Sequence, residues 1–156
     1  MALGARSPMA RLVPAGLAIL LLVWSCAWPT RARESATSGD LTVTVMDVKC
    51  GASVSDGRGR VLPKGQFCRL SMTVRNDGSG VVTVVAAQTT VKDSNGKVHR
   101  ASAATMGADG SIFLKQIHPG KKVTGVAYYD VPAGTKPVTV EFRGSALSSP
   151  AEVSLP

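Results

Sequence analysis

The stretch QFCRLSMTVRNDGSG, residues 66–80, alternates between apolar and polar side chains before it ends in turn-forming residues. Its apolar phase consists of Cys68, Leu70, Met72 and Val74, and its polar phase of Arg69, Ser71, Thr73 and Arg75. Successive side chains of a β-strand point to opposite faces, so this alternation predicts a strand with one buried face. We therefore expect Cys68 to point into the core and the NDGSG segment to turn the chain.

Further strand patterns recur at short intervals, separated by segments rich in Gly, Pro, Asn and Asp. They cover residues 41–48, 81–88, 89–92, 97–101, 111–117, 123–130, 138–143 and 152–155. No stretch combines helical periodicity with capping residues. Many short strands of this kind predict an all-β sandwich or barrel, here a single domain over residues 41–156. The small polar residues of segment 33–40 predict a flexible tether before it.

The sequence DSNG at residues 93–96 predicts a β-hairpin between two of these strands. Two registers are possible for this hairpin. A type I turn with Gly96 in the left-handed region would place Asp93 opposite Lys97, whereas a two-residue Asn-Gly turn would place Ser94 there.

Residues 1–32 have the pattern of an export signal. Arg6 and Arg11 give its start a positive charge, and the apolar run LAILLLVW follows at residues 17–24. Small residues then offer two cleavage sites, after Ala27 or after Ala32. After cleavage we expect no transmembrane segment and a secreted or extracytoplasmic, envelope-associated protein.

Two alternatives to cleavage stay open for this segment. The uncharged span over residues 12–30 is near the length that crosses a bilayer, so it could remain as an anchor helix. Cys26 could instead carry a lipid, although Trp24 two residues before it fits a lipoprotein signal poorly.

Export leads to an oxidising compartment, where disulfides persist. Cleavage after Ala27 or Ala32 removes Cys26 and leaves Cys50 and Cys68, which can pair in only one way. We therefore predict a Cys50–Cys68 disulfide, which explains a cysteine on the apolar face of a strand.

The chain that remains after removal of residues 1–32 has a positive net charge. The full chain has a net charge of +8, and loss of the three arginines in residues 1–32 leaves 15 basic against 10 acidic residues, or +5. The few aromatic residues do not alternate with basic ones as a nucleic-acid platform requires, so we expect no nucleic-acid partner. The long segments 50–65 and 102–110 are candidate binding loops. Three basic residues of the first segment are either a candidate site for an anionic partner or part of a solvated loop: Arg58, Arg60 and Lys64.

Four motifs together resemble a family of small exported bacterial domains of unknown function, some of which carry a misleading telomeric repeat-binding factor label. The motifs are VRNDG at 74–78, DSNGK at 93–97, PGKKVTG at 119–125 and YDVP at 129–132. The resemblance covers residues 63–143. It implies an immunoglobulin-like antiparallel β-sandwich, related in fold to the mycobacterial immunoprotective extracellular antigen. It also implies export, often with a lipid anchor or tether, and supplies no catalytic residues. The pattern does not require Cys50 and Cys68.

Residues for catalysis or metal binding are scarce. The two histidines, His99 and His118, lie in no hydrolase or protease motif, so we expect no enzyme activity and no catalytic residues. Met72 and Met106 could join them as soft copper ligands, but no tight His/Met spacing supports this, and we expect no metal or other cofactor.

These observations predict an exported, non-catalytic module that binds an unknown protein or an anionic envelope component. The alternatives are a lipid-anchored envelope protein with a structural role, held through Cys26, and a copper-binding protein.

Overall fold

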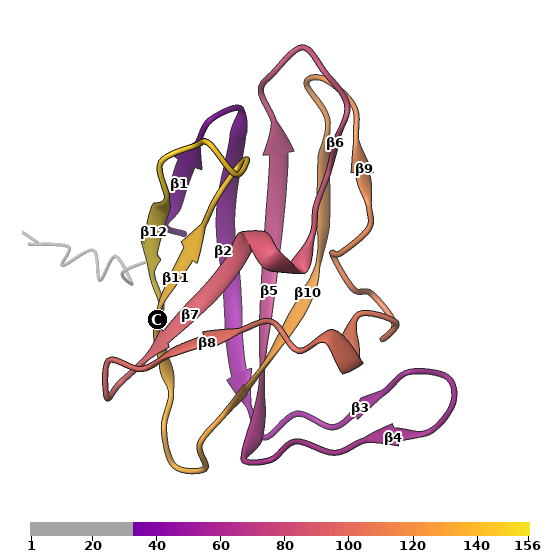
Figure 1. Cartoon of the computed structure of the whole chain (residues 1–156), viewed down its shortest axis with the longest axis vertical. Coiled ribbons are helices and arrows are strands. Elements are labelled where there is room, and N and C mark those ends of the chain that lie inside the picture. Colours follow the sequence, from indigo (N-terminus) through magenta and orange to yellow (C-terminus); the bar gives the residue numbers. More distant parts are fainter. Residues whose placement is uncertain (1–32) are drawn as a thin grey trace, which may run out of the picture. The chain divides into compact units, whose positions relative to one another are not determined.

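The computed structural model describes residues 33–156, and these form two facing antiparallel sheets (Figure 1). Sheet I has the order β1 (Ser35–Ser38), β2 (Leu41–Cys50), β5 (Gln66–Asn76) and β10 (Lys122–Val131). Sheet II has the order β12 (Ala151–Ser154), β11 (Pro137–Phe142), β7 (Thr89–Asp93) and β8 (Val98–Arg100). The predicted immunoglobulin-like β-sandwich is confirmed.

Short elements complete the domain. The two-stranded pairs are β3 (Val54–Ser55) with β4 (Arg60–Val61), and β6 (Val82–Thr83) with β9 (Gln116–Ile117). Two short 3₁₀ helices cover Ala86–Gln88 and Ala103–Thr105. Residues 81–88 and 111–117 were expected to be strands along their whole length, which is wrong. Only two residues of each stretch pair, as β6 and β9. The first stretch continues into the 3₁₀ helix Ala86–Gln88, and the second contains Leu114, whose φ is 63°.

The main core lies between the two sheets. The apolar phase of β5 is fully buried as predicted, with Cys68, Leu70, Met72 and Val74 each 0% exposed. Sheet II contributes Val91, Val140 and Phe142. A polar link across this core joins the Tyr129 hydroxyl to Thr89 Oγ1, 2.7 Å away. Burial raises the pKa of the Tyr129 phenol far above its usual value, so this hydroxyl remains a hydrogen-bond donor.

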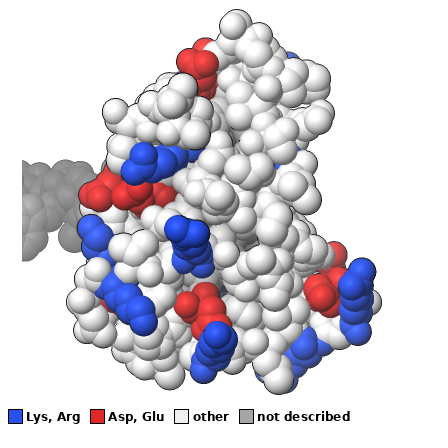
Figure 2. Space-filling model, viewed as in Figure 1, with Lys and Arg blue, Asp and Glu red and all other residues white. Residues whose placement is uncertain are grey.

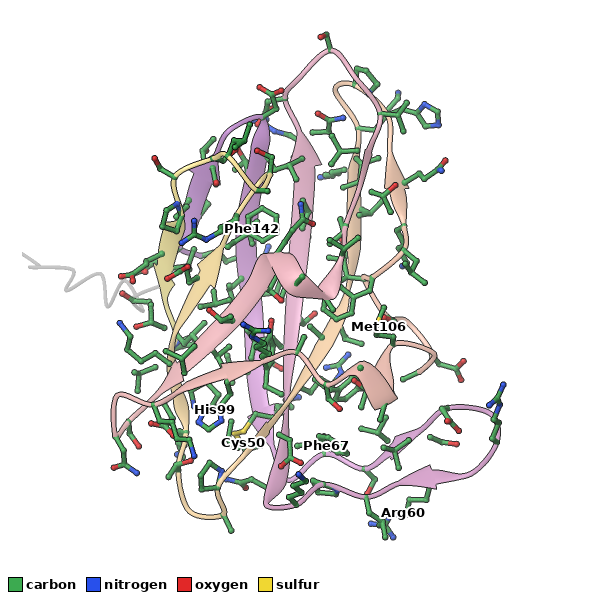
Figure 3. All side chains as sticks on the ribbon, in the orientation of Figure 1. Cys50, Arg60, Phe67, His99, Met106 and Phe142 are labelled. Carbon is green, nitrogen blue, oxygen red and sulfur yellow. A yellow bond between two sulfur atoms is a disulfide. The ribbon has the colours of Figure 1, made fainter. Side chains whose placement is uncertain are left out.

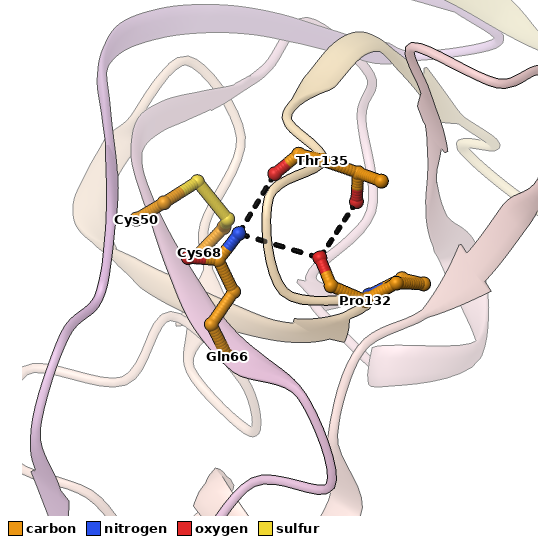
Figure 4. Close-up of a disulfide and its surroundings, with 5 residues drawn as sticks. All are labelled: Cys50, Gln66, Cys68, Pro132 and Thr135. Carbon is orange, nitrogen blue, oxygen red and sulfur yellow. Dashed lines mark hydrogen bonds between the residues drawn. A yellow bond between two sulfur atoms is a disulfide. The ribbon is translucent and has the colours of Figure 1, made fainter.

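A β-bulge at Met46 makes the predicted disulfide possible. Before the bulge, the odd-numbered residues of β2, such as Val43 and Val45, face the core. After it, the even-numbered Val48 packs against the core. The register of β2 against β5 shifts by one residue between Val45 and Asp47. The shift places Cys50 directly opposite Cys68, and the two form a disulfide between adjacent strands of sheet I (Figures 3 and 4).

The two sheets are joined along both edges. At one edge Ser38 in β1 donates its hydroxyl to the Ser149 carbonyl at 2.6 Å and accepts the Gly144 N–H at 2.9 Å. At the other edge, beside β8, the Ser102 N–H donates to the Tyr128 carbonyl at 2.8 Å. The expectation of a flexible tether over residues 33–40 is wrong in its central part, because Ser35–Ser38 pairs with β2 as strand β1.

The hairpin after β7 adopts the first of the two predicted registers. The Asp93 N–H donates to the Lys97 carbonyl at 2.9 Å, and Gly96 has a φ of 80°. Asp93 therefore lies opposite Lys97. A β-branched or other L-residue at position 96 would be strained in this left-handed conformation.

The predicted export signal at residues 1–32, with Cys26 and both predicted cleavage sites, lies outside the residues that the structure describes. Within residues 33–156, no helix has the length and apolar character needed to cross a membrane.

Candidate functional site

The three basic residues predicted to bind an anionic partner do not form one cluster. Arg58 lies at the tip of the β3–β4 hairpin, where its N–H and that of Gly59 donate to the Asp56 carboxylate. Arg60 donates from its guanidinium to Ser53 at 3.3 Å. Lys64 lines a different hollow, beside Asp130. On this side of the molecule, basic side chains are interspersed with acidic ones (Figure 2).

The four candidate copper ligands are also apart. Met72 is fully buried in the core. His99 lies at the end of the sandwich that carries Asp130, whereas His118 lies in a turn that is bonded to Asn76 at the opposite end of β5. His99 and Met106 belong to different elements and are well separated in Figure 3. Within the described chain, no group of three or more His, Cys, Asp or Glu residues could hold a metal ion.

The two candidate binding loops instead cover part of the outer face of sheet I. The β3–β4 hairpin extends from the sandwich (Figure 1) but has a buried base at Val54. Val54 from this hairpin and Ala108 from the second loop pack on Phe67, Val126 and Tyr128 to form a small second core. The Phe67 and Tyr128 rings meet edge to face, with centroids 6.4 Å apart. These loops leave the other half of the outer face open.

The open half carries a row of hydroxyl groups that crosses all four strands of sheet I. The register aligns Ser35 with Thr44, Thr44 with Thr73, and Thr73 with Thr124. The Thr73 and Thr124 hydroxyls are hydrogen-bonded at 2.8 Å. Neighbouring strands are about 4.8 Å apart, so the row presents hydroxyls at a regular spacing.

The adjacent row adds positive charge. Thr42 aligns with Arg75, and Arg75 with Lys122. Asp77 lies beside this row, accepting a hydrogen bond from Thr42 at 2.7 Å and an ion pair from Arg75 at 2.7 Å. Like charges directly opposite on neighbouring strands destabilise a sheet, by up to about 1 kcal/mol. Asp77 compensates the charge of Arg75, so Lys122 is the cation of this row that has no acidic partner among the described residues.

Together these side chains line a shallow hollow of about 520 Å³. Its lining consists of Arg33, Ser35, Thr42, Thr44, Met46, Thr73, Arg75, Lys122 and Thr124. We call this surface the hydroxyl-and-cation face. It contains three cations, no acidic side chain and several hydroxyls, so it is suited to phosphate, sulfate or carboxylate groups on a hydroxyl-rich molecule.

Sequence reasoning missed this face, although part of its signal was visible. Thr73 and Arg75 are in the polar phase of residues 66–76, and Thr42 and Thr44 are in the polar phase of the preceding strand. The strand pairing that brings these phases together was not predictable from their spacing, because it joins residues far apart in the chain.

Comparison with known proteins identifies the family. Over residues 32–152 the chain matches the family described as domain of unknown function DUF4352. The chain belongs to the DUF4352 family. This confirms the resemblance to a domain family of unknown function. The DUF4352 match extends beyond residues 63–143, where the motifs lie, on both sides. No curated protein matches the chain.

Two solved structures share the fold of this DUF4352 domain. The secreted protein MPT63 from Mycobacterium tuberculosis is 23% identical, with a TM-score of 0.57 over 72% of this chain and 86% of MPT63. The yjhA protein from Bacillus subtilis is 19% identical, with a TM-score of 0.57 over 79% of this chain and 97% of yjhA. The match to a secreted mycobacterial protein agrees with the fold relationship that the motifs implied.

Proposed function

We propose that this DUF4352 protein is an exported, non-catalytic module that binds an anionic, hydroxyl-rich polymer of the cell envelope through the hydroxyl-and-cation face. The observation that carries the proposal is the row of hydroxyls beside the opposed cations Arg75 and Lys122. A bound anion would pair with Lys122, which has no acidic partner among the described residues, and the hydroxyls would hydrogen-bond the polymer's own hydroxyl groups.

Three features support the location. Residues 1–32 have the composition of an export signal. The Cys50–Cys68 disulfide is suited to an oxidising compartment. The fold is shared with a secreted protein.

The test measures binding to a synthetic glycerol-phosphate oligomer, with neutral dextran as the comparison probe, over a range of salt concentrations. We expect the oligomer to bind more tightly than dextran, and its affinity to fall as salt rises. The double variant Arg75→Gln/Lys122→Gln should weaken oligomer binding about tenfold. The matched control is Arg58→Gln/Arg60→Gln, which removes the same charge from the β3–β4 hairpin.

A second readout separates binding from folding. Lys122 makes no ion pair among the described residues, so Lys122→Gln should leave the thermal midpoint nearly unchanged while it weakens binding. Equal affinity for dextran and the oligomer would contradict the proposal. A larger loss in the Arg58/Arg60 variant than in the Arg75/Lys122 variant would move the site to the hairpin.

The second candidate function is that of a lipid-anchored envelope protein with a structural role. It rests on Cys26, which lies at the end of the apolar segment. Intact mass of the protein from membranes and culture fluid distinguishes the two. A chain that begins at Cys26 with added acyl mass supports anchoring, and a chain that begins near residue 28 or 33 supports secretion.

A further inference from the structure

A second hollow lies at the end of the sandwich that carries the disulfide, away from the hydroxyl-and-cation face. It has a volume of about 630 Å³ and is formed by the start of β5, the hairpin before β8 and the turn after β10. Its lining consists of Lys64, Gly65, Lys97, His99, Asp130, Val131, Pro132 and Ala133. We call it the lysine groove.

The acidic groups of the lysine groove are already occupied. Asp130 accepts the N–H groups of Lys64 at 2.7 Å and Gly65 at 3.0 Å, one on each oxygen. Behind the groove, Asp93 accepts the Asn95 and Lys97 N–H groups on one oxygen and His99 Nε2 on the other, 2.8 Å away. Both carboxylates therefore serve to position the walls, and neither has an oxygen without a hydrogen-bond donor.

The basic groups of the groove are free. Within residues 33–156, neither the Lys64 nor the Lys97 ammonium group is in an ion pair, unlike Lys49 and Lys92, which have acidic partners. His99 Nε2 is held by Asp93, so this ring shapes the wall of the groove. The groove thus offers two ammonium groups to an incoming anion.

The floor of the groove is apolar and held in place. Gln66 donates from its amide to the carbonyls of Thr135 at 2.8 Å and Pro132 at 3.4 Å, next to the disulfide (Figure 4). Gly65 lies so close to the Val131 carbonyl that a Cβ at this position would collide with it. A site fixed in this way loses little freedom when a ligand binds.

We propose that the lysine groove binds the C-terminal carboxylate of a short peptide that ends in small apolar residues. The carboxylate would lie between the Lys64 and Lys97 ammonium groups, and the apolar side chains would rest on Pro132 and Ala133. Charge complementarity favours this occupant, because the two ammonium groups outnumber the one Asp130 carboxylate of the lining, and the exposed floor is apolar and small. This site is separate from the polymer surface and does not depend on it.

The test is an NMR titration of the exported chain with N-acetyl-Ala-Ala, with the C-terminal amide of the same dipeptide as the comparison probe. We expect saturable shifts at the Lys64, Gly65 and Lys97 amides and at the His99 ring. The dissociation constant should be on the order of 1 mM for a ligand of this size. The amide should bind about tenfold more weakly, because it lacks the charge-assisted hydrogen bonds.

The variants Lys64→Met and Lys97→Met keep the aliphatic stem and should each weaken binding of the acid about fivefold. Lys92→Met is the matched control, since Lys92 is on the neighbouring strand and paired with Glu152. The inference is overturned if acid and amide bind equally, if shifts fall outside the groove, or if Lys92→Met has the same effect. Equal competition by inorganic phosphate would also overturn it, since the site would then accept any anion. If Lys97→Met binds the glycerol-phosphate oligomer normally, a negative result in the peptide titration leaves the proposed polymer binding intact.

Discussion

At the scale of single residues, Asp93 links the hairpin turn to strand β8. Its side chain is 1% exposed, and it lies at the end of β7. Hydrogen bonding to His99 is the largest cause that lowers the pKa of the Asp93 carboxyl, with further help from the Asn95 and Lys97 N–H groups. Partial desolvation opposes this shift. The charged form of Asp93 therefore stabilises the hairpin that carries Lys97 and His99.

Low pH should lower the free energy of unfolding, because the Asp93 carboxylate becomes protonated. Its folded-state pKa lies below its unfolded value, so its contribution is present above the unfolded pKa and is lost as pH falls through the folded pKa. We expect Asp93→Asn to be less stable than wild type at pH 7 and to differ little from it at pH 2. Urea unfolding between pH 2 and pH 7 measures the free energy of unfolding of both proteins. Asp109→Asn, an exposed residue, is the control. A constant difference between Asp93→Asn and wild type at all pH values would contradict the assignment.

At the scale of elements, the register between β2 and β5 depends on one extra residue in β2, Met46. Without the bulge at Met46, alternation from Leu41, Val43 and Val45 would turn Cys50 to the opposite face from Cys68. The sequence contains a sign of the bulge, since the apolar spacing changes from two residues to three between Val45 and Val48. The disulfide joins the strands at the end where the lysine groove lies.

Loss of the disulfide should destabilise the domain without changing its fold. The bond closes a loop with a sequence separation of 18 residues. We expect Cys50→Ala/Cys68→Ala to lower the free energy of unfolding by about 3 kcal/mol, because the unfolded chain gains freedom. Urea unfolding of the variant, and of wild type with reductant, measures the change. An unchanged free energy in both would contradict the argument.

At the scale of the whole molecule, the sandwich is closed by contacts along both edges. Ser38 of β1 bonds the segment between β11 and β12, and Ser102 bonds β10. Strand β1 also covers the edge of β2, which would otherwise present unpaired N–H and C=O groups. The segment expected to be a tether is therefore part of the fold.

Removal of residues 33–40 should destabilise the domain and expose the edge of β2. We expect a loss of about 2 kcal/mol, or a thermal midpoint lower by roughly 8 °C, together with self-association at high concentration. Calorimetry and light scattering measure these effects. Ser38→Ala should show a smaller loss and no self-association, because β1 remains. A truncated chain as stable and monomeric as the longer one would restore the tether interpretation.

Local patterns predicted much of the fold. The buried phase of β5, the all-β class and the position of most strands follow from alternation and turn residues, which act over a few neighbouring positions. The short length of β6 could not be predicted, because the apolar run VVTVVAAQ looks the same whether it pairs or turns. Of the proposed sites, only Lys64 and His99 were candidates from the sequence. The hydroxyl-and-cation face depends on pairing between distant strands.

The sequence by itself determined which side chains of β5 face the core, where its turn residues lie, and that Cys50 and Cys68 are the two cysteines beyond residue 32. These properties depend on neighbouring residues and on the count of cysteines. Only the tertiary structure decided that Thr44, Thr73 and Thr124 form one row, that Lys64 and Lys97 share a groove, and that β1 closes an edge. The physical reason is that strand register and edge contacts are set by packing of the whole core, which joins residues far apart in the chain.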